Sequence, residues 1–271
     1  PSPLPAAEPP PRSVTMAEKS LKEIVARQRA IFARAEKEGE HLDAAWLRGE
    51  MQAVINSYDI LIQKSPDFAP AYVAYGMLLG QVGMTREAVG ILLKANKLDG
   101  EIPVVKNEMA RFLAEDGKLV DALPWLMAAI DLAPQEPLYH YHLGKLLTEG
   151  RDQSIKTGQF TRSALDQAML HAVARAAELA PDNFGYAYRH AEAYYDLGTP
   201  QWDAALARWR QLDAGVETPL EHQTLRLHQA NVLLKQGKVA EARALADTVT
   251  EMTLAKQKQT LLDSLAQAGA K

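Results

Sequence analysis

The sequence contains no cysteine, which excludes disulfides, thiolate chemistry, cysteine-ligated zinc and iron–sulfur clusters. It also contains no run of about 18 or more apolar residues, so no transmembrane segment is predicted. Basic residues are not in excess, because 30 lysines and arginines stand against 34 aspartates and glutamates. The net charge of −4 therefore gives no reason to expect a nucleic acid as partner. With 47% hydrophobic residues over 271 positions, the chain can build a substantial core.

Proline is scarce except at the start of the chain: 6 of the 15 prolines lie at or before Pro11, and the other 9 are spread over the rest of the sequence. Residues 1–17 are therefore predicted to be a proline-rich tether in extended polyproline conformations. Such a segment would hold the folded body away from a membrane or another domain, offer a ligand to a proline-binding groove, or be a terminus without a role.

The first residues do not form a signal peptide, since they have neither a basic start nor an apolar stretch. The chain begins at Pro1, which indicates a processed or trimmed product, unless translation starts at Met16. A mature-looking chain without cysteine favours an exported, periplasmic or membrane-tethered bacterial protein, with a cytoplasmic protein as the alternative. A signal peptide or anchor upstream of Pro1 would decide between them.

Between residues 66 and 137 the chain repeats itself every 34 residues. Small residues and leucines recur at this spacing, and turn glycines and alanines keep the same register. A period of this length is typical of stacked helical hairpins. The matched sets are Gly76, Ala110 and Gly144; Leu79, Leu113 and Leu147; Gly83 and Gly117; Ala88 and Ala122; Ala95 and Ala129; and Leu98 and Leu132.

Each repeat contains two apolar stripes at helical spacing, separated by a turn glycine. In the best-defined repeat, Tyr72 and Leu79 belong to the first stripe and Leu92 belongs to the second. Gly76 and Ala88 are predicted to lie where the two antiparallel helices approach most closely, because a larger side chain would force the helices apart.

These residues resemble the tetratricopeptide repeat family, whose pattern has the same period and places small residues, leucines or aromatics, a turn glycine and a closing proline in this order. The resemblance implies an all-α fold, a right-handed superhelical solenoid of about six helical hairpins followed by a C-terminal capping helix. The expected parts are the tether at 1–17, the solenoid at 18–271 with repeats at about 18–68, 69–102, 103–136, 137–183, 184–218 and 219–254, and the capping helix at 255–268.

The fourth repeat is longer than the others, since Pro134 and Pro181, which close successive repeats, are separated by more than one period. The excess falls at residues 150–163, between two predicted helices, and contains Arg151, Lys156 and Arg162. We expect either a long exposed loop, where insertions in repeat arrays usually lie, or a docking element with local positive charge.

No motif for catalysis or metal binding stands out. The histidines are poorly spaced for chelation, since His140 and His142 are two residues apart and His222 and His228 are six apart. The HExxH, calcium-loop and phosphate-loop motifs are absent. We therefore expect no enzyme activity, no catalytic residue, no metal and no cofactor.

The resemblance also implies a binding site, because the first helices of successive tetratricopeptide repeats line a concave groove. In that groove Asn107, Arg111 and Lys145 would receive a carboxylate or an acidic peptide through charge-assisted hydrogen bonds. The family's lysine–asparagine clamp for a terminal carboxylate is not reproduced, since Val73 stands where its first lysine would be. A solvated face with ordinary charges is the alternative. The implied groove residues are Val73, Met77, Asn107, Arg111, Tyr141, Lys145, Tyr188, Glu192, Asn231 and Lys235.

We therefore expect a non-enzymatic protein–protein interaction scaffold that binds a peptide or a partner protein in the concave groove. The alternative is a structural subunit of a larger complex, either membrane-associated or self-assembling. The identity of the partner does not follow from the fold, because this architecture serves many unrelated partners.

Overall fold

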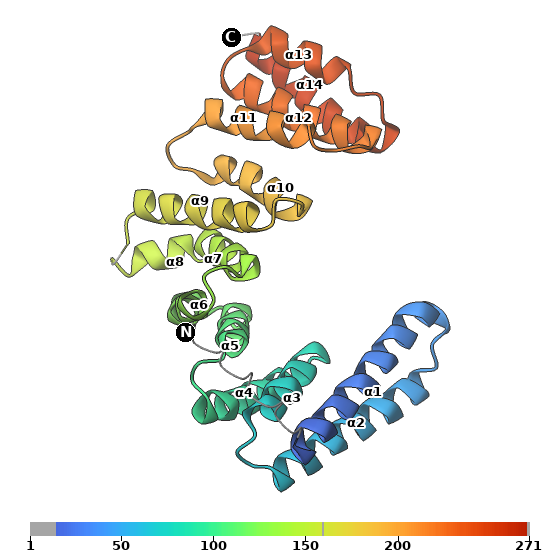
Figure 1. The fold of residues 1–271 in the computed structure, drawn as a ribbon. Helices are drawn as coiled ribbons and strands as arrows, with labels where there is room; N and C mark the ends of the chain where they lie inside the picture. The colour runs from blue at the N-terminus through green and yellow to red at the C-terminus, as the bar shows by residue number, and fades with distance from the viewer. Residues whose placement is uncertain (1–14, 159, 270–271) are drawn as a thin grey trace, which may run out of the picture. The chain divides into compact units, whose positions relative to one another are not determined.

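The computed structural model describes residues 15–158 and 160–269. Every regular element within these ranges is helical (Figure 1), which confirms the all-α fold class predicted from the sequence. The predicted tether lies outside the described residues except for Thr15, Met16 and Ala17, and the last two are the first residues of helix α1. No helix in the described part of the chain combines the length and the apolar character needed to cross a membrane.

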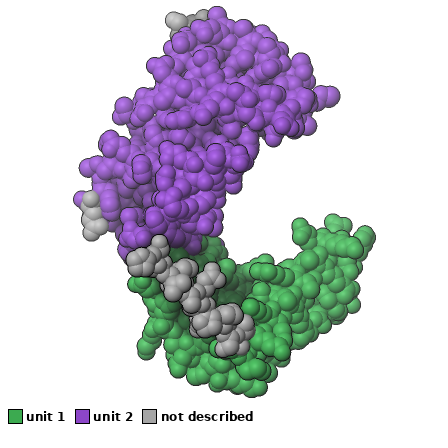
Figure 2. Space-filling model, viewed as in Figure 1, with its two compact units in different colours: residues 1–112 green, residues 113–271 purple. Residues whose placement is uncertain are grey.

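The chain divides into two compact units, one up to Phe112 and one from Leu113 onwards. Figure 2 colours this N-terminal unit and this C-terminal unit separately. The division falls within helix α5 (Pro103–Glu115). Helices α3, α5 and α7 start at Ala69, Pro103 and Pro137, so their starts are evenly spaced and follow the period of the sequence repeats.

The N-terminal unit contains two helical hairpins and residues 103–112 of α5. Polar side chains explain where the helices begin: Thr15 and Glu18 form a capping box on α1, and the Asp43 carboxylate accepts amide hydrogen bonds at the start of α2. Pro70 lies in the first turn of α3, where a missing amide hydrogen costs nothing. The helices are α1 (Met16–Glu38), α2 (Ala44–Lys64), α3 (Ala69–Gln81) and α4 (Thr85–Leu98).

Gly76 lies where α3 and α4 approach most closely. A Cβ atom at this position would be 2.6 Å from Leu92 Cγ, closer than real Cβ contacts allow. Ala88, on the facing helix, is fully buried. The close approach predicted at these two small residues is therefore confirmed. Between the helices, Gly83 has a φ of 81°, a left-handed conformation that favours glycine at this turn.

We expect Gly76→Ala to lower the free energy of unfolding by about 1–3 kcal/mol, because the added methyl group displaces Leu92. Gly90→Ala is the matched control in α4. A Cβ atom there meets no atom within 4 Å, and alanine favours a helix over glycine by about 0.5–1 kcal/mol. Urea unfolding followed by circular dichroism measures both changes. Stabilisation by both substitutions would contradict the close packing of α3 on α4.

The C-terminal unit continues the hairpins and includes a short additional helix, α8 (Arg151–Lys156), within the insert predicted at residues 150–163. Pro124 is the sixth residue of α6, beyond the first turn, so one amide hydrogen is missing inside this helix. The other elements are α6 (Leu119–Leu132), α7 (Pro137–Glu149), α9 (Arg162–Leu179), α10 (Phe184–Glu192), η2 (Ala193–Asp196), α11 (Trp202–Asp213), α12 (Pro219–Lys235), α13 (Val239–Asp247), η3 (Met252–Leu254) and α14 (Ala255–Gly269).

An apolar cluster at the end of the C-terminal unit joins α10 to α14. Trp209 of α11 is fully buried in it, together with Val232 of α12. Helix α14 packs on α12 and α13 (Figure 1) and buries Leu261 and Leu265 against the same cluster. The last hairpin, α12–α13, is therefore covered on its outer side, as the end of a stack of repeats requires for solubility.

Candidate binding surface

The groove residues predicted from the sequence lie on the first helices of the hairpins. The N-terminal unit carries four of them, on α3 and α5, and the C-terminal unit carries six, on α7, α10 and α12. The set of six is called the first-helix face below and consists of Tyr141, Lys145, Tyr188, Glu192, Asn231 and Lys235.

The two predicted groove residues of α3, Val73 and Met77, are both apolar. The Met77 side chain is 43% exposed, and Val73, one turn earlier, is half-buried. Methionine is flexible and polarisable, so an exposed one adapts to partners of different shape. This part of α3 therefore offers an apolar contact and no charge.

On α5 the predicted receptors for a carboxylate already contact a carboxylate of their own helix. Arg111 Nε and Nη2 donate hydrogen bonds to Glu108 Oε2 at 2.9 and 2.8 Å. Asn107, only 2% exposed, donates to Glu108 Oε1 at 3.2 Å. The guanidinium also lies over the ring of Phe112, 4.3 Å from its centroid. Glu108 was not predicted from the sequence, although a glutamate three residues before an arginine is a known helix-stabilising pair.

Tyr188, on α10, is held in place by contacts with three neighbouring rings. Its hydroxyl lies 2.7 Å from His228 Nε2 on α12, in a hydrogen bond whose direction follows the imidazole tautomer. Its ring meets Trp209 edge-on at 5.1 Å between centroids and contacts Phe184 at 5.7 Å. Burial, and to a lesser degree the charge of Glu192, raises the pKa of the Tyr188 hydroxyl. A ring fixed in this way loses little conformational entropy when it binds a partner.

Tyr141 and Lys145 represent α7 on the first-helix face. The Tyr141 ring packs on Tyr186 of α10, with 5.2 Å between the centroids. Lys145 is exposed, and its ammonium lies 3.8 Å from Glu149 one turn later. A solvated pair at this distance contributes little to stability, so the lysine is available to a partner.

Arg189, which the sequence analysis did not single out, connects α7 with α10. Its Nη2 donates to Thr148 Oγ1 at 2.8 Å and to Asp196 Oδ2 at 2.9 Å. Its Nη1 donates to Glu192 Oε2 at 3.3 Å. The predicted groove residue Glu192 is therefore paired with a neighbouring cation. No regular spacing predicts the contact with Thr148, which is 41 residues away along the chain.

On α12 the predicted pair is displaced by one turn. Aligning Ala230 with Ala191 of α10 places Leu227 and Asn231 at the positions that Tyr188 and Glu192 occupy. Leu227 is buried, Asn231 is half-buried and Lys235 is exposed. Leu227 was therefore not predicted, although the same alignment of alanines identifies it.

Two arginines of the insert point at the buried carboxylate of Asp166 in α9. Arg162 Nε donates to both carboxylate oxygens, at 3.0 and 3.1 Å, and Arg151 Nε lies 3.2 Å from Oδ1. The amide of Gly198 donates to the other oxygen, Oδ2, at 2.7 Å. Two of the three predicted basic residues of the insert therefore anchor it to the fold, while Lys156 is exposed.

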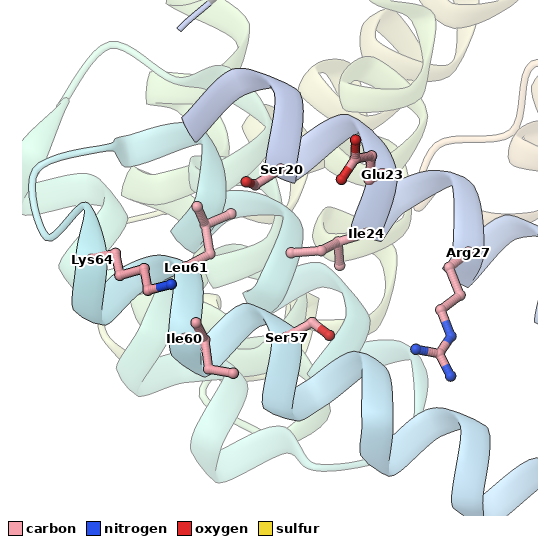
Figure 3. Close-up of a pocket in the computed structure, with 8 residues that line it drawn as sticks. All are labelled: Ser20, Glu23, Ile24, Arg27, Ser57, Ile60, Leu61 and Lys64. Atoms are coloured by element: carbon pink, nitrogen blue, oxygen red, sulfur yellow. The ribbon is translucent and has the colours of Figure 1, made fainter. Parts of the chain in front are cut away.

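A cavity of about 350 Å³ lies between α1 and α2 in the N-terminal unit. In Figure 3, Ile24 extends from α1 towards α2, and Arg27 and Lys64 lie at opposite ends of the cavity. Ile60, on its α2 side, is 51% exposed. This cavity was not expected from the sequence, because neither helix belongs to a strongly matching repeat.

Two histidines that were considered as metal ligands have local partners instead. His140 Nε2 lies 2.9 Å from the backbone oxygen of Pro134, and His222 Nδ1 lies 2.7 Å from Asp213 Oδ1. Among the described residues, no three histidine, aspartate or glutamate side chains gather in a metal-binding arrangement.

Two other histidines, His190 and His228, have lowered pKa values, so we expect acid to destabilise the C-terminal unit. Burial lowers the pKa of His228 from 6.5 to about 4, and burial together with the charge of Arg208 lowers the pKa of His190 to about 4. In the unfolded chain both histidines titrate near 6.5. Between these two values the unfolded state binds more protons, so stability is complete above the unfolded pKa and falls as the pH approaches 4.

We expect the free energy of unfolding to fall by on the order of 3 kcal/mol between neutral pH and about pH 4.5. Urea unfolding at a series of pH values measures this decline, and the variant His228→Gln should decline less. Protonation of carboxylates affects both proteins equally and cancels in the difference. Identical declines in the two proteins would contradict a lowered pKa at His228.

No protein-family model matches the chain, and no curated protein matches it. Solved structures do match. YrrB, described as a TPR protein with an unusual peptide-binding site, is similar over 79% of this chain and 98% of its own, with a TM-score of 0.59 and 16% identity. PilF of Pseudomonas aeruginosa is similar over 92% of this chain and 100% of its own, with a TM-score of 0.55 and 14% identity.

A chain of the Naa15/Naa10 complex bound to HypK-THB is similar over 93% of this chain and 35% of its own, with a TM-score of 0.57 and 14% identity. Identities this low carry information about the fold alone. The regular spacing of the helix starts, the close approach at Gly76 and these similarities agree with one another. The chain therefore has the tetratricopeptide repeat fold.

Proposed function

We propose that this chain is a non-enzymatic scaffold that binds a peptide or a partner protein on the first helices of its repeats. The fold is of the kind that serves protein–protein interaction, since stacked helical pairs expose an extended surface. One protein of similar fold supports a binding function, because YrrB is described as having a peptide-binding site.

The single observation that carries the proposal is the way in which Tyr188 is presented on the first-helix face. Its ring is half-buried and is fixed by Trp209, while its hydroxyl is fixed by His228. Tyrosine is enriched among the residues that dominate binding energy at interfaces. Tyr141, packed on Tyr186, adds a second fixed aromatic ring from α7.

The charged residues of α7 and α10 suit a polar rim around the tyrosines of the same helices. Lys145 of α7 is exposed, and Glu192 of α10 is paired with Arg189. Exposed lysines steer an approaching partner and add selectivity more than affinity. We therefore expect binding to depend on the tyrosines for strength and on Lys145 for the rate of association.

The test is affinity capture with the full chain, compared side by side with the variant Lys145→Glu. Reversal of this exposed charge should reduce the recovery of a specific partner by about tenfold without altering helicity or melting. Arg243→Glu, an equal reversal at an exposed position of the second helix α13, is the control and should retain the partner. Equal recovery by both variants would overturn the placement of the partner on the first-helix face.

The second candidate, a self-assembling structural subunit, is favoured by the half-exposed Ile60 beside the cavity between α1 and α2. Ile24 and Leu61 line the same cavity, so the apolar surface offered to another chain is larger than a single side chain. Light scattering over a range of concentrations tests this candidate. A rise in mass that Ile60→Asp abolishes would support it, and a constant monomer mass would exclude it.

A further inference from the structure

Besides the cavity between α1 and α2, a cavity lies in the C-terminal unit, and no residue of the first-helix face lines it. It lies among the last turns of α9, helix α10, helix α11 and the loops that follow α9 and α11, and it has a volume of about 580 Å³. Sites for small molecules typically measure about 300–1,000 Å³. This cavity, called the α9–α11 pocket below, therefore has the size of a ligand site.

One part of the pocket wall is apolar. Phe184 at the start of α10 is partly exposed to it, and Leu212 and Val216 line it from α11 and the loop after α11. Alanines of α9 and α10, such as Ala177 and Ala187, keep the walls short and leave room between the helices. A ligand body of hydrocarbon or aromatic character would bury its surface here.

His190, which also lines the pocket, is a buried polar side chain without a partner. Its residue is 8% exposed, and its ring stacks on Tyr194 at 5.9 Å between centroids. Neither ring nitrogen has a hydrogen-bond partner among the residues that the structure describes. The ring nitrogens are not among the fully enclosed atoms that lack a partner, so the imidazole of His190 is open to water or to a ligand inside the pocket.

Charges of both signs act on His190, and the stronger one is positive. Arg208 of α11 lines the same pocket. The burial of His190 is the largest cause of its lowered pKa, and the positive charge of Arg208 is the second. Arg208 Nη1 donates to Gln211 Oε1 at 2.9 Å and has no carboxylate partner in the described part of the chain. The negative charge of Glu178 of α9 raises the pKa of His190, but this carboxylate is paired with Arg175, whose Nη1 lies 3.3 Å from Glu178 Oε2. Asp182 also lines the pocket but is not among the groups that act on His190.

We propose that the α9–α11 pocket binds a small apolar carboxylate, with its carboxylate on Arg208 and His190 and its body against Phe184, Leu212 and Val216. An uncompensated guanidinium binds a carboxylate through charge-assisted hydrogen bonds. The neutral imidazole supplies one further N–H donor. This chemistry is shared by a free organic acid and by the C-terminus of a peptide whose last residue is apolar.

The probe is octanoate, titrated into the full chain by calorimetry and followed at the His190 ring by NMR. We expect saturable binding that shifts the His190 resonances, and we expect Arg208→Gln to weaken it by about tenfold or more. Arg210→Gln is the matched control, because Arg210 is exposed on the same helix and does not line the pocket. It should leave the affinity unchanged.

Further ligands test whether the carboxylate is required and whether the natural ligand is a free acid or a peptide terminus. Octanol and octylamine should bind at least about tenfold more weakly than octanoate, because they lack the anion. The affinity of a short acetylated peptide that ends in leucine is then compared with that of octanoate. Tighter binding of the peptide would identify a peptide terminus as the natural ligand, and weaker binding would identify a free acid. The proposal is overturned if octanoate does not bind, if it leaves the His190 resonances in place, if octanol binds equally well, or if the two arginine variants behave alike.

Discussion

Replacing Trp209 with alanine is expected to lower the free energy of unfolding of the C-terminal unit by about 3–5 kcal/mol. The indole is fully buried and lies at the meeting point of three helical elements. It stacks on His228 of α12 at 4.2 Å between centroids with an interplanar angle of 11°. It also meets Tyr188 of α10 at 5.1 Å and Tyr195 of η2 at 6.1 Å. Its removal leaves a cavity that α10, η2 and α12 would have to close together.

Guanidinium unfolding followed by circular dichroism measures this loss. Trp202→Ala is the matched control, since Trp202 lies on the same helix but is only half-buried. We expect it to cost about half as much, because less apolar surface is returned to water. A loss at Trp209 no larger than that at Trp202 would show that the α11 contacts with α10 and α12 do not hold the C-terminal unit together.

Asp166→Asn is expected to lower the free energy of unfolding by about 3 kcal/mol or more. The Asp166 carboxylate is buried and balances two arginines that reach it from the insert. Arg151 is itself nearly buried, so loss of the acidic charge would leave a cation in the interior without compensation. The amide of Gly198 would lose its charged acceptor in the same step.

The control for this substitution is Asp152→Asn, which removes an exposed aspartate on α8 and should change stability by less than about 0.5 kcal/mol. A double-mutant cycle with Arg151→Gln then isolates the ion pair, and we expect the two losses to be less than additive. Additive losses would show that Arg151 and Asp166 do not interact, and the insert would then have to be held by other contacts.

Much of the fold could be predicted from the sequence, because the packing of helical hairpins imposes a repeated pattern. Small residues are needed wherever two helices touch, so Gly76 and Gly144 appear at the same position of their repeats and face Leu92 and Val173. The turn glycines Gly83 and Gly117 both have positive φ values and are separated by one period. Requirements of this kind are local or periodic, and a single sequence displays them.

The side-chain partners at the candidate sites could not be predicted in the same way. Asp166 binds the amide of Gly198, and Tyr188 binds His228, across 32 and 40 residues that include loops of irregular length. The register of the repeats identifies which face of a helix a residue occupies but not which neighbour it reaches. The basic residues of the insert were therefore compatible with a long exposed loop or with a docking element, whereas the structure pairs Arg151 and Arg162 with Asp166.

The most direct test of the proposed scaffold function is hydrogen–deuterium exchange of the full chain with and without its captured partner. If the partner binds on the first-helix face, protection will concentrate in α7, α10 and α12 and will include the peptides that contain Tyr141 and Tyr188. Protection confined to the second helices α9, α11 and α13, or to α1 and α14 at the ends, would contradict the account.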